Sequence, residues 1–583
     1  MNPPVTVPST GRREEEWYVR RLLAAALLMA AFLSLWWLDG PLQGSEGRWA
    51  TVVTEMMKSG DYFRMTIAGA PYPDKPFGSY WLIALTAALT GNLNEWATRL
   101  PGALSFILTT GLVFAIGKRT VGALPAALAA CIFATTFQLV LFSRVASADP
   151  QTVLGVALAM LLILEASEAP RWWYLPVLGT VMGITSLMKG LGGAAVPAFA
   201  ACLWALAVRG VAWVRPVPTL LALLAFVMTL GVPLAIPWLT RGDTGPLVLL
   251  WRESVTRGLD PFDHVQPWYF YFWNQFVLLA PWSVLLPAAL LTGWLSIRRQ
   301  LRAGGGSTAR VFARSEDRRR IFPLFAYLAI FLLFTLSGSR RTYYLLPLAP
   351  FFSLMVAEAL LDSQPGWTAR LRKWALTVLA IVGIALGVTA VALGMARLAS
   401  PQMAPALLDY RGQLVAKYWQ AIPVGIILVG ACVPLAILLL KRIDDRLRAL
   451  APAIALTFVI LAGVIGTMEP LRAQALRLQE FCAAVRQIVP EGEAIDVDWR
   501  RVDDPSAMPL TDAPKLLFYL GRPFAKRGAP PARFLIVDQQ QAEQMLAREP
   551  GAYLRRTVEP SDPLSRSDRK TNAQRRVLLE RLR

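Results

Sequence analysis

The sequence predicts an all-α polytopic membrane protein of about 13 transmembrane helices, followed by a small α/β domain. Of its 583 residues, 55% are hydrophobic and 17% are charged, and the mean hydropathy is +0.45. This balance is far from that of a soluble protein. Apolar runs long enough to cross a hydrocarbon core, about 20 residues each, recur from Leu22 to about Ile465. Beyond Met468 the chain becomes polar.

Each long apolar run is interpreted as one membrane span. The predicted spans are residues 20–38, 96–117, 121–140, 151–168, 172–188, 190–208, 217–239, 275–297, 321–338, 342–361, 374–395, 420–440 and 450–468. No secretory cleavage site follows the first run, so this run is expected to remain as a helix. Basic loops between spans mark the cytoplasmic side, and the basic N-terminal segment is therefore expected in the cytoplasm.

The formal charge of +20 could suggest a nucleic-acid partner, because basic surfaces attract phosphate backbones. The position of the charge argues against this. Eight arginines crowd the segment 298–320 between two apolar runs, which is how positive-inside orientation is encoded. We therefore expect no nucleic-acid partner.

The segment from Phe77 to Leu89 is apolar but short, and it lies between Pro76 and Gly91. If it crossed the membrane, all later basic loops would change sides. We therefore expect a re-entrant or interfacial helix.

The region 469–583 is predicted to be a periplasmic α/β domain that follows the membrane domain 1–468. Strand-length apolar pieces occur at Ala494–Trp499 and Phe534–Val537, separated by helical patterns at Leu471–Ile488 and Asp512–Leu520. The polar and basic stretch from Ser561 onward is expected to be partly disordered.

The predicted topology gathers short charged strings on the outer side of the membrane. The strings are Ser45-Glu46-Gly47-Arg48-Trp49, Asp74-Lys75-Pro76, Ser147-Ala148-Asp149-Pro150, Met188-Lys189-Gly190, Asp263-His264 and Ser339-Arg340-Arg341-Thr342-Tyr343-Tyr344. Taken singly, each string also fits a structural role, such as surface ion pairs or arginines that snorkel at a helix end.

In this order and spacing, the strings resemble bacterial lipid A aminoarabinose transferases and, more distantly, protein O-mannosyltransferases, both of the GT-C superfamily. The resemblance covers roughly residues 20 to 365. It implies a GT-C fold in the bacterial inner membrane, an undecaprenyl-phosphate-linked sugar donor, inversion at the sugar, and an acceptor on the periplasmic side. The chain is accordingly expected to be a hexosyl- or pentosyltransferase.

Cations are expected to bind the donor. A polyprenyl phosphate gains negative charge as the glycosidic bond breaks, and cations in a low-dielectric pocket stabilise that charge. The predicted donor-binding residues are Arg48, Lys75, Lys189, Arg340, Arg341 and Tyr344.

An inverting transfer also needs a carboxylate that takes the acceptor proton. The resembled enzymes carry an Asp-Glu pair in the first outer loop, whereas this chain has Ser45 and Glu46. A serine hydroxyl is not a base at neutral pH. Glu46 and then Asp149 are the predicted catalytic residues, and a non-catalytic relative is the alternative.

His264 is the one histidine in the sequence. The resemblance implies a divalent metal, zinc, held by Asp74 and His264, with open positions for phosphate and water. The alternative is a hydrogen-bonded structural histidine.

The predicted function is transfer of a sugar from an undecaprenyl phosphate carrier to lipid A or another envelope glycan or glycolipid, by a monomer that also contacts membrane lipids. Protein O-glycosylation is a second enzymatic hypothesis. A lipid-carrier transporter is a third, but it predicts charges near the bilayer midplane and repeated halves. Here the informative charges gather at one surface.

Overall fold

The structure is a computed structural model of the full chain. It describes residues 9–72, 74–206, 210–252, 256, 264–303, 314–399, 423–475, 478–497, 512–522, 524, 530–559 and 575–582.

The first half of the chain is almost entirely helical, with one small hairpin. Its elements are α1 (Ser9–Leu35), α2 (Glu46–Ser59), β1 (Thr66–Ile67), β2 (Ala70–Pro71), α3 (Gly78–Thr90), α4 (Glu95–Thr120), α5 (Ala123–Ala134), α6 (Phe137–Ser143), α7 (Asp149–Glu168), α8 (Tyr174–Lys189), α9 (Gly192–Trp204), α10 (Pro216–Arg241), α11 (Gly245–Trp251) and α13 (Phe270–Leu278).

The second half adds further helices and then the strands of a terminal domain. These elements are η3 (Trp282–Leu285), α14 (Leu286–Ala303), α16 (Ser315–Leu336), η4 (Thr342–Leu348), α17 (Ala349–Leu361), α18 (Trp367–Ala399), α21 (Pro423–Gly430), α22 (Cys432–Arg442), α23 (Leu450–Ala475), α24 (Leu478–Ile488), β3 (Ile495–Val497), α26 (Asp512–Leu520), β4 (Phe534–Asp538), α27 (Gln539–Arg548), β5 (Tyr553–Val558) and β6 (Arg576–Arg581).

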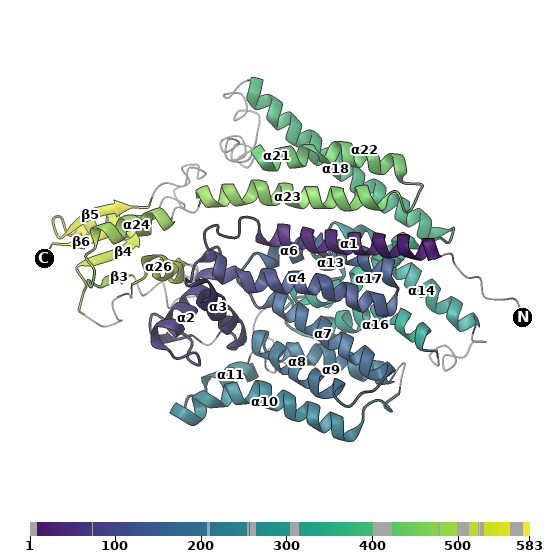
Figure 1. The fold of residues 1–583 in the computed structure, drawn as a ribbon. Coiled ribbons are helices and arrows are strands. Elements are labelled where there is room, and N and C mark those ends of the chain that lie inside the picture. The colour runs from purple at the N-terminus through teal and green to yellow at the C-terminus, as the bar shows by residue number, and fades with distance from the viewer. Residues whose placement is uncertain are drawn as a thin grey trace, which may run out of the picture.

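The membrane part is a bundle of long apolar helices (Figure 1). Within the described residues, eight helices are long and apolar enough to cross a membrane, or ten if two bent helix pairs each count as one span. The prediction of a mainly helical polytopic chain is therefore confirmed, but a count of 13 is not. Shorter helices occupy the other predicted spans: α8, α9, and the pair α21 and α22.

The segment predicted to be re-entrant forms the 13-residue helix α3. At about 1.5 Å per residue, α3 is too short for a hydrocarbon core of about 30 Å. It packs on α4, α2 and α8 and buries Tyr80 and Ile83.

Small residues let the helices of the bundle approach closely. A Cβ atom added at Gly117 of α4 would lie 2.7 Å from the Cβ of Ala126 in α5. Similarly, a Cβ at Gly179 of α8 would lie 2.0 Å from the carbonyl oxygen of Ala222 in α10. Such close backbone packing is typical of membrane helices, which gain little from hydrophobic burial against each other.

The terminal domain is a four-stranded sheet in the order β3-β4-β6-β5, packed with α24, α26 and α27. β3 runs parallel to β4, whereas β6 is antiparallel to both β4 and β5. The predicted helix over Asp512–Leu520 and the strand at Phe534–Val537 are present. The stretch beyond Ser561, expected to be partly disordered, contains the ordered strand β6, which lies inside the sheet. Residues 560–574 lie outside the described residues.

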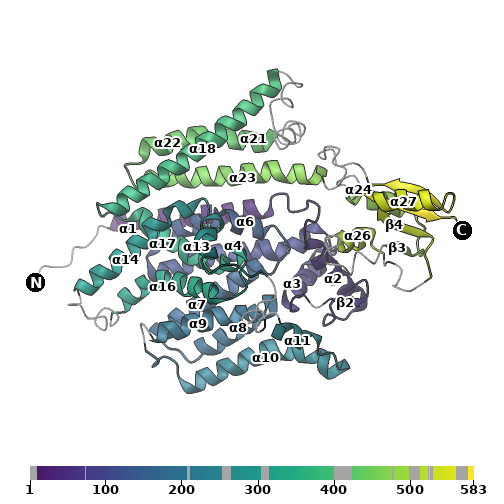
Figure 2. The ribbon, with the colours of Figure 1, turned by 180° about the vertical axis from the view of Figure 1, so that it is seen from behind.

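The terminal sheet lies at the end of the bundle away from the start of α1 (Figures 1 and 2). The helical part of the terminal domain, α24 and α26, forms hydrogen bonds with the first interhelical loop, with α2 and with the start of α4. The backbone N–H of Leu42 donates to the Tyr519 hydroxyl at 2.8 Å, Thr51 donates to the Pro514 carbonyl at 2.6 Å, and the Gln479 amide donates to Glu95 at 2.6 Å. The terminal domain therefore braces α2.

Candidate functional site

A cavity of about 390 Å³ lies where four segments of the bundle meet. The segments are the first interhelical loop with α2, the start of α7, the junction of α8 and α9, and the turn from α16 into η4. Its charged and polar lining residues are Ser45, Arg48, Asp74, Lys75, Ser147, Asp149, Thr152, Lys189, Ser337, Ser339, Arg341, Tyr343 and Tyr344. Sequence segments nearly 300 residues apart thus share one polar chamber.

The first loop contributes two cations and their partners. Arg48, in the first turn of α2, donates through Nη1 to the Tyr72 hydroxyl at 2.8 Å, and its Nε is buried without a described partner. Burial acts to lower the pKa of Arg48, but Tyr72 and the Asp74 carboxylate outweigh it and raise the pKa. The Nζ of Lys75 lies 3.2 Å from Asp74 Oδ1. Arg48 and Lys75 both line the cavity wall.

Helices α7 and α8 place an acid beside a base. Asp149 is the first residue of α7 and is followed by Pro150, which is tolerated in a first turn because its missing N–H has no helical partner there. Lys189 is the last residue of α8, and Gly190, with φ of 107°, ends that helix. A carboxylate at a helix start and an ammonium at a helix end both match the helix dipole. Their side chains form an ion pair.

The turn from α16 into η4 forms a third side of the cavity. The Arg341 guanidinium contacts the Tyr343 hydroxyl at 2.5 Å, and the Arg341 carbonyl accepts from the Tyr271 hydroxyl at 3.2 Å. The Lys189 ammonium lies 4.9 Å from the ring centre of Tyr343 and 5.1 Å from that of Tyr344. Cations over aromatic faces are favourably held when they are desolvated.

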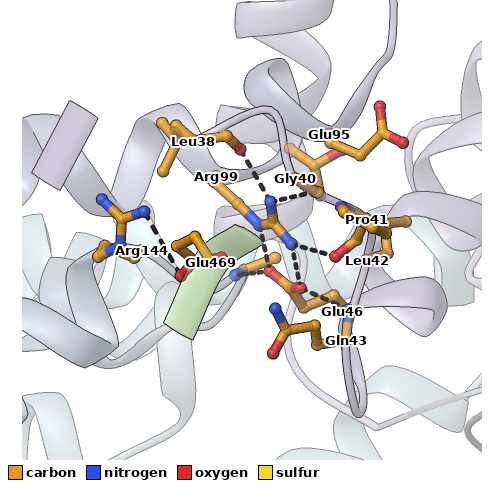
Figure 3. A network of polar contacts seen from close by, with 12 residues as sticks. Leu38, Gly40, Pro41, Leu42, Gln43, Glu46, Glu95, Arg99, Arg144 and Glu469 are labelled. Carbon is orange, nitrogen blue, oxygen red and sulfur yellow. Dashed lines mark hydrogen bonds and ion pairs between the residues drawn. The ribbon is translucent and has the colours of Figure 1, made fainter. Parts of the chain in front are cut away.

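Glu46 lies beside this chamber and does not line it. Its carboxylate is 1% exposed and forms a two-point ion pair with Arg99 of α4, at 2.8 Å from Nε and 2.7 Å from Nη2. The same carboxylate accepts from the backbone N–H groups of Gln43 at 2.7 Å and Ala146 at 2.9 Å. Figure 3 shows it beside Arg99 and Gln43. This environment favours a structural role over proton transfer.

Arg99 of α4 holds the beginning of the first interhelical loop in place. Besides Glu46, its guanidinium donates to the carbonyls of Leu38, Gly40 and Pro41, at 2.8, 2.5 and 2.9 Å (Figure 3). Ser45 and Arg48 lie next to Glu46 in the chain. The hydrogen bonds of Arg99 therefore fix the part of α2 that faces the cavity.

A second buried arginine lies next to the hydrogen-bond network of Arg99. Arg144, at the end of α6, donates to the carbonyl of Leu33 at 2.8 Å and lies 3.5 Å from the Glu469 carboxylate of α23 (Figure 3). Arg144 therefore links the first helix, the loop before Asp149 and the last long helix.

Besides Glu46, two further predicted site residues lie outside the cavity lining. Arg340 turns away: its guanidinium donates to the carbonyls of Gln266 and Thr335. His264 is exposed, its carbonyl accepts from the Arg340 N–H at 3.0 Å, and its Nε2 contacts the Arg341 guanidinium. The geometry thus gives Arg340 a structural contact, although its sequence position beside Arg341 suggested phosphate binding.

The predicted zinc ligands do not form a fitting metal site. Asp74 pairs with Lys75, and the ring of His264 faces a guanidinium, which would repel a metal cation. Within the described part of the chain, no three His, Cys, Asp or Glu side chains are grouped closely enough to hold an ion. Zinc binding remains a prediction.

Comparisons with known proteins show which families the chain is similar to. Residues 74–235 match the family of dolichyl-phosphate-mannose-protein mannosyltransferases. An undecaprenyl phosphate-α-4-amino-4-deoxy-L-arabinose arabinosyl transferase of Pseudomonas fluorescens is 26% identical over 58% of this chain and 56% of its own length. A protein of the same name from Edwardsiella ictaluri is 29% identical over 54% of each. The chain spans about half the length of the curated relatives it matches.

Among solved structures, ArnT from Cupriavidus metallidurans bound to undecaprenyl phosphate covers 97% of this chain and 98% of its own, with a TM-score of 0.68 and 18% identity. At this identity the likeness establishes the fold alone. The chain resembles the GT-C aminoarabinose transferases. The resemblance inferred from the short motifs is therefore confirmed.

The sequence alone gave no role to several charged residues at this site. Arg99 and Arg144 are the most informative, because both are buried arginines at the ends of apolar runs. An ionisable residue in such a run is rare and usually paired, and this signal was available in the sequence. The partners, Glu46 and Glu469, could not be assigned without the fold, since they lie 53 and 325 residues away in the chain.

Proposed function

We propose that the chain is a glycosyltransferase that moves a sugar from an undecaprenyl phosphate carrier to lipid A or another envelope glycan or glycolipid. One observation supports this most directly: the buried Asp149 carboxylate shares a cavity with Arg48, Lys75, Lys189 and Arg341. A chamber with a surplus of cations around one buried carboxylate suits a phosphate leaving group and an acceptor proton.

In this proposal the cations hold the carrier phosphate. Arg48 and Arg341 provide planar guanidinium groups for paired hydrogen bonds, whereas Lys75 and Lys189 act as point charges. When the bond between the anomeric carbon and the phosphate oxygen breaks, its electron pair stays on that oxygen. The added negative charge is stabilised more strongly in this enclosed site than it would be in water.

Asp149 takes the proton in the same step. The acceptor hydroxyl attacks the anomeric carbon from the face opposite the phosphate, and its proton moves to the Asp149 carboxylate. In the free enzyme Lys189 pairs with Asp149. An incoming phosphate competes for Lys189, so donor binding would release the carboxylate for the acceptor. The base would then become available only when a donor is in place.

Glu46, our other sequence candidate, serves this scheme as a positioning residue. Its four contacts with Arg99, Gln43 and Ala146 hold the first loop and the approach to α7 together. Ser45 lines the cavity at the position where the resembled enzymes carry an aspartate. Its hydroxyl can donate a hydrogen bond to a sugar or a phosphate oxygen but cannot replace the base.

Protein O-glycosylation is the second candidate, and the match of residues 74–235 to protein mannosyltransferases favours it. The matched region contains Lys75, Asp149 and Lys189, which serve the donor in either case. The acceptor therefore separates the two functions. A non-catalytic relative and a lipid-carrier transporter are the remaining alternatives.

The proposed setting is a bacterial inner membrane. The N-terminus would face the cytoplasm, the terminal domain and the cavity would face the periplasm, and the enzyme would act as a monomer. Figure 1 supports the relative placement, since the terminal domain and the start of α1 lie at opposite ends of the bundle.

The test uses purified full-length protein in liposomes with undecaprenyl phosphate carrying a labelled sugar. Aminoarabinose is tried first and a hexose second. The expected result is label in added lipid A together with an equal amount of free undecaprenyl phosphate. Label in added periplasmic proteins instead would favour O-glycosylation. Movement of intact carrier across the bilayer without bond cleavage would overturn the proposal in favour of a transporter.

A further inference from the structure

A second polar cavity lies at the opposite end of the η4–α17 segment from the first. Tyr343 and Tyr344 at the start of this segment line the first cavity, whereas Glu358 and Leu361 at its end line the second. The second cavity has a volume of about 380 Å³ and is enclosed by α14, α16, α17 and the start of α5. It plays no part in the proposed transfer, because the whole of α17 separates it from Asp149.

Charges of both signs line this cavity. Arg299 of α14 and Arg320 of α16 are its two cations, and Glu358 and Asp362 are its two anions. Arg320 Nε lies 3.3 Å from Glu358 Oε1. Asp362 accepts from the backbone N–H of Gln364 at 3.1 Å. A purely anionic ligand would meet two carboxylates here, and a purely cationic one would meet two guanidinium groups.

A buried hydroxyl group in the cavity wall lacks a partner. Thr292 of α14 lines the cavity and is 7% exposed, yet its Oγ1 forms no hydrogen bond with any described residue. Burying an unpaired hydroxyl costs about 1–3 kcal/mol, so such groups usually have a ligand or water. This atom is an independent sign that something polar occupies the cavity.

The surroundings point to a lipid. Apolar side chains of Ile297, Ile321 and Leu324 complete the wall. On the outside of α14, Leu290 and Trp294 are exposed, as expected of a surface in contact with lipid. Arg298 and Arg299 follow on the same helix, and a tryptophan followed by basic residues is typical of a membrane interface.

We propose that this second cavity binds the headgroup of a zwitterionic phospholipid with a primary ammonium, of the phosphatidylethanolamine type. The ammonium pairs with Glu358 and Asp362, the phosphodiester pairs with Arg299 and Arg320, and Thr292 donates to a headgroup oxygen. The acyl chains leave along the apolar surface of α14. Basic pockets between membrane helices are known to hold lipid headgroups, and the paired carboxylates here select a zwitterion.

The experiment measures lipid retained by the purified full-length protein in detergent, using native mass spectrometry. The probes are phosphatidylethanolamine, phosphatidylcholine and phosphatidylglycerol with identical acyl chains, and soluble glycerophosphoethanolamine. Retention of phosphatidylethanolamine should exceed that of the other two lipids by about tenfold, the worth of one hydrogen bond to a charged group. Equal retention of phosphatidylcholine or phosphatidylglycerol would overturn the proposal, and so would binding of the soluble headgroup alone.

Three variants of lining residues and one control variant locate the site. Glu358→Gln and Arg299→Gln should each lower phosphatidylethanolamine retention severalfold. Arg302→Gln, one turn further along α14 and outside the cavity lining, is the matched control and should leave it unchanged. Thr292→Val should lower retention while the lipid-free protein keeps or gains thermal stability, because the unpaired hydroxyl is removed. If Thr292→Val and Glu358→Gln both retain lipid like the unmodified protein, the assignment is wrong.

Discussion

Lys189, the last residue of α8, forms an ion pair with Asp149, the first residue of α7. Each residue is oriented by its helix terminus, and both line the same cavity. The ion pair occupies the Asp149 carboxylate until Lys189 is engaged elsewhere. The pair therefore couples donor binding to proton acceptance in the proposed reaction.

We predict that Lys189→Met weakens donor binding by about tenfold or more. This is the loss of affinity that corresponds to the free energy of one hydrogen bond to a charged group. The turnover should fall as well, because the phosphate loses one of its cations. Binding of undecaprenyl phosphate, measured by competition with a labelled donor, checks this. Lys118→Met at the exposed far end of α4 is the control, and equal affinity in both variants would contradict the role of Lys189.

We predict that Glu46→Gln acts mainly on stability. It leaves the buried Arg99 without its counter-charge, which costs about 3–5 kcal/mol in comparable buried pairs. The melting temperature in detergent should therefore fall by several degrees, while the protein that remains folded keeps most of its kcat. A stable Glu46→Gln variant with no turnover would instead make Glu46 the base.

The double variant Glu46→Gln/Arg99→Met is the control for this prediction. It removes both charges, so it should recover part of the stability that Glu46→Gln loses. A double variant less stable than either single variant would show that the two residues do not act as a pair.

The neighbours Arg340 and Arg341 provide a matched comparison. Arg341 lines the cavity, whereas the guanidinium of Arg340 donates to backbone carbonyls outside it. Arg341→Gln should weaken donor binding by about ten- to a hundredfold, and Arg340→Gln should leave donor affinity nearly unchanged. Isothermal binding measurements on both variants decide this, and the reverse ranking would contradict the assigned cavity.

The terminal domain should influence the site through Gly47. A Cβ at Gly47 would lie 2.9 Å from the backbone nitrogen of Lys515 in α26, so α2 or α26 must shift. We expect Gly47→Ala to lower both the melting temperature and donor affinity, because Ser45 and Arg48 move with α2. Gly111→Ala in α4, where a Cβ meets only Leu27 Cδ2 at 3.9 Å, should change neither.

Substitution of His264, the one histidine in the sequence, tests the predicted zinc binding. His264→Ala would lower the zinc content of purified protein if the prediction from the motif is right, and elemental analysis measures it. The geometry favours an unchanged metal content, because Arg341 contacts the His264 ring. The same variant should then lower donor affinity only slightly, through Arg341.

The sequence predicted those parts of the fold that depend on the residue pattern of a single segment. Long apolar runs gave the helices, and the helical pattern at Asp512–Leu520 matches α26. Breaks within runs were not predictable: α5 and α6 meet at 63°, and Phe270–Leu278 and Trp282–Arg302 meet at 119°. β6 was missed because a strand that closes a sheet gains its stability from partners distant in the chain.

The site was predictable as a set of residue types but not as a geometry. Charged residues beside apolar runs pointed to Arg48, Asp149 and Lys189. Nothing local distinguished Glu46, which faces Arg99, from Asp149, which faces the cavity. Both follow small residues at the start of a helix, and only the packing of α4 against the first loop separates them.

The most direct measurement of the central claim is single-turnover sugar transfer by Asp149→Asn, with donor saturating and binding measured separately. Loss of the general base should slow transfer by about 10²–10⁴-fold while the donor still binds. Asp74→Asn, at the other carboxylate of the same cavity, should slow it far less. Transfer by Asp149→Asn at the unmodified rate, or a larger loss in Asp74→Asn, would contradict the assignment of Asp149 as the base.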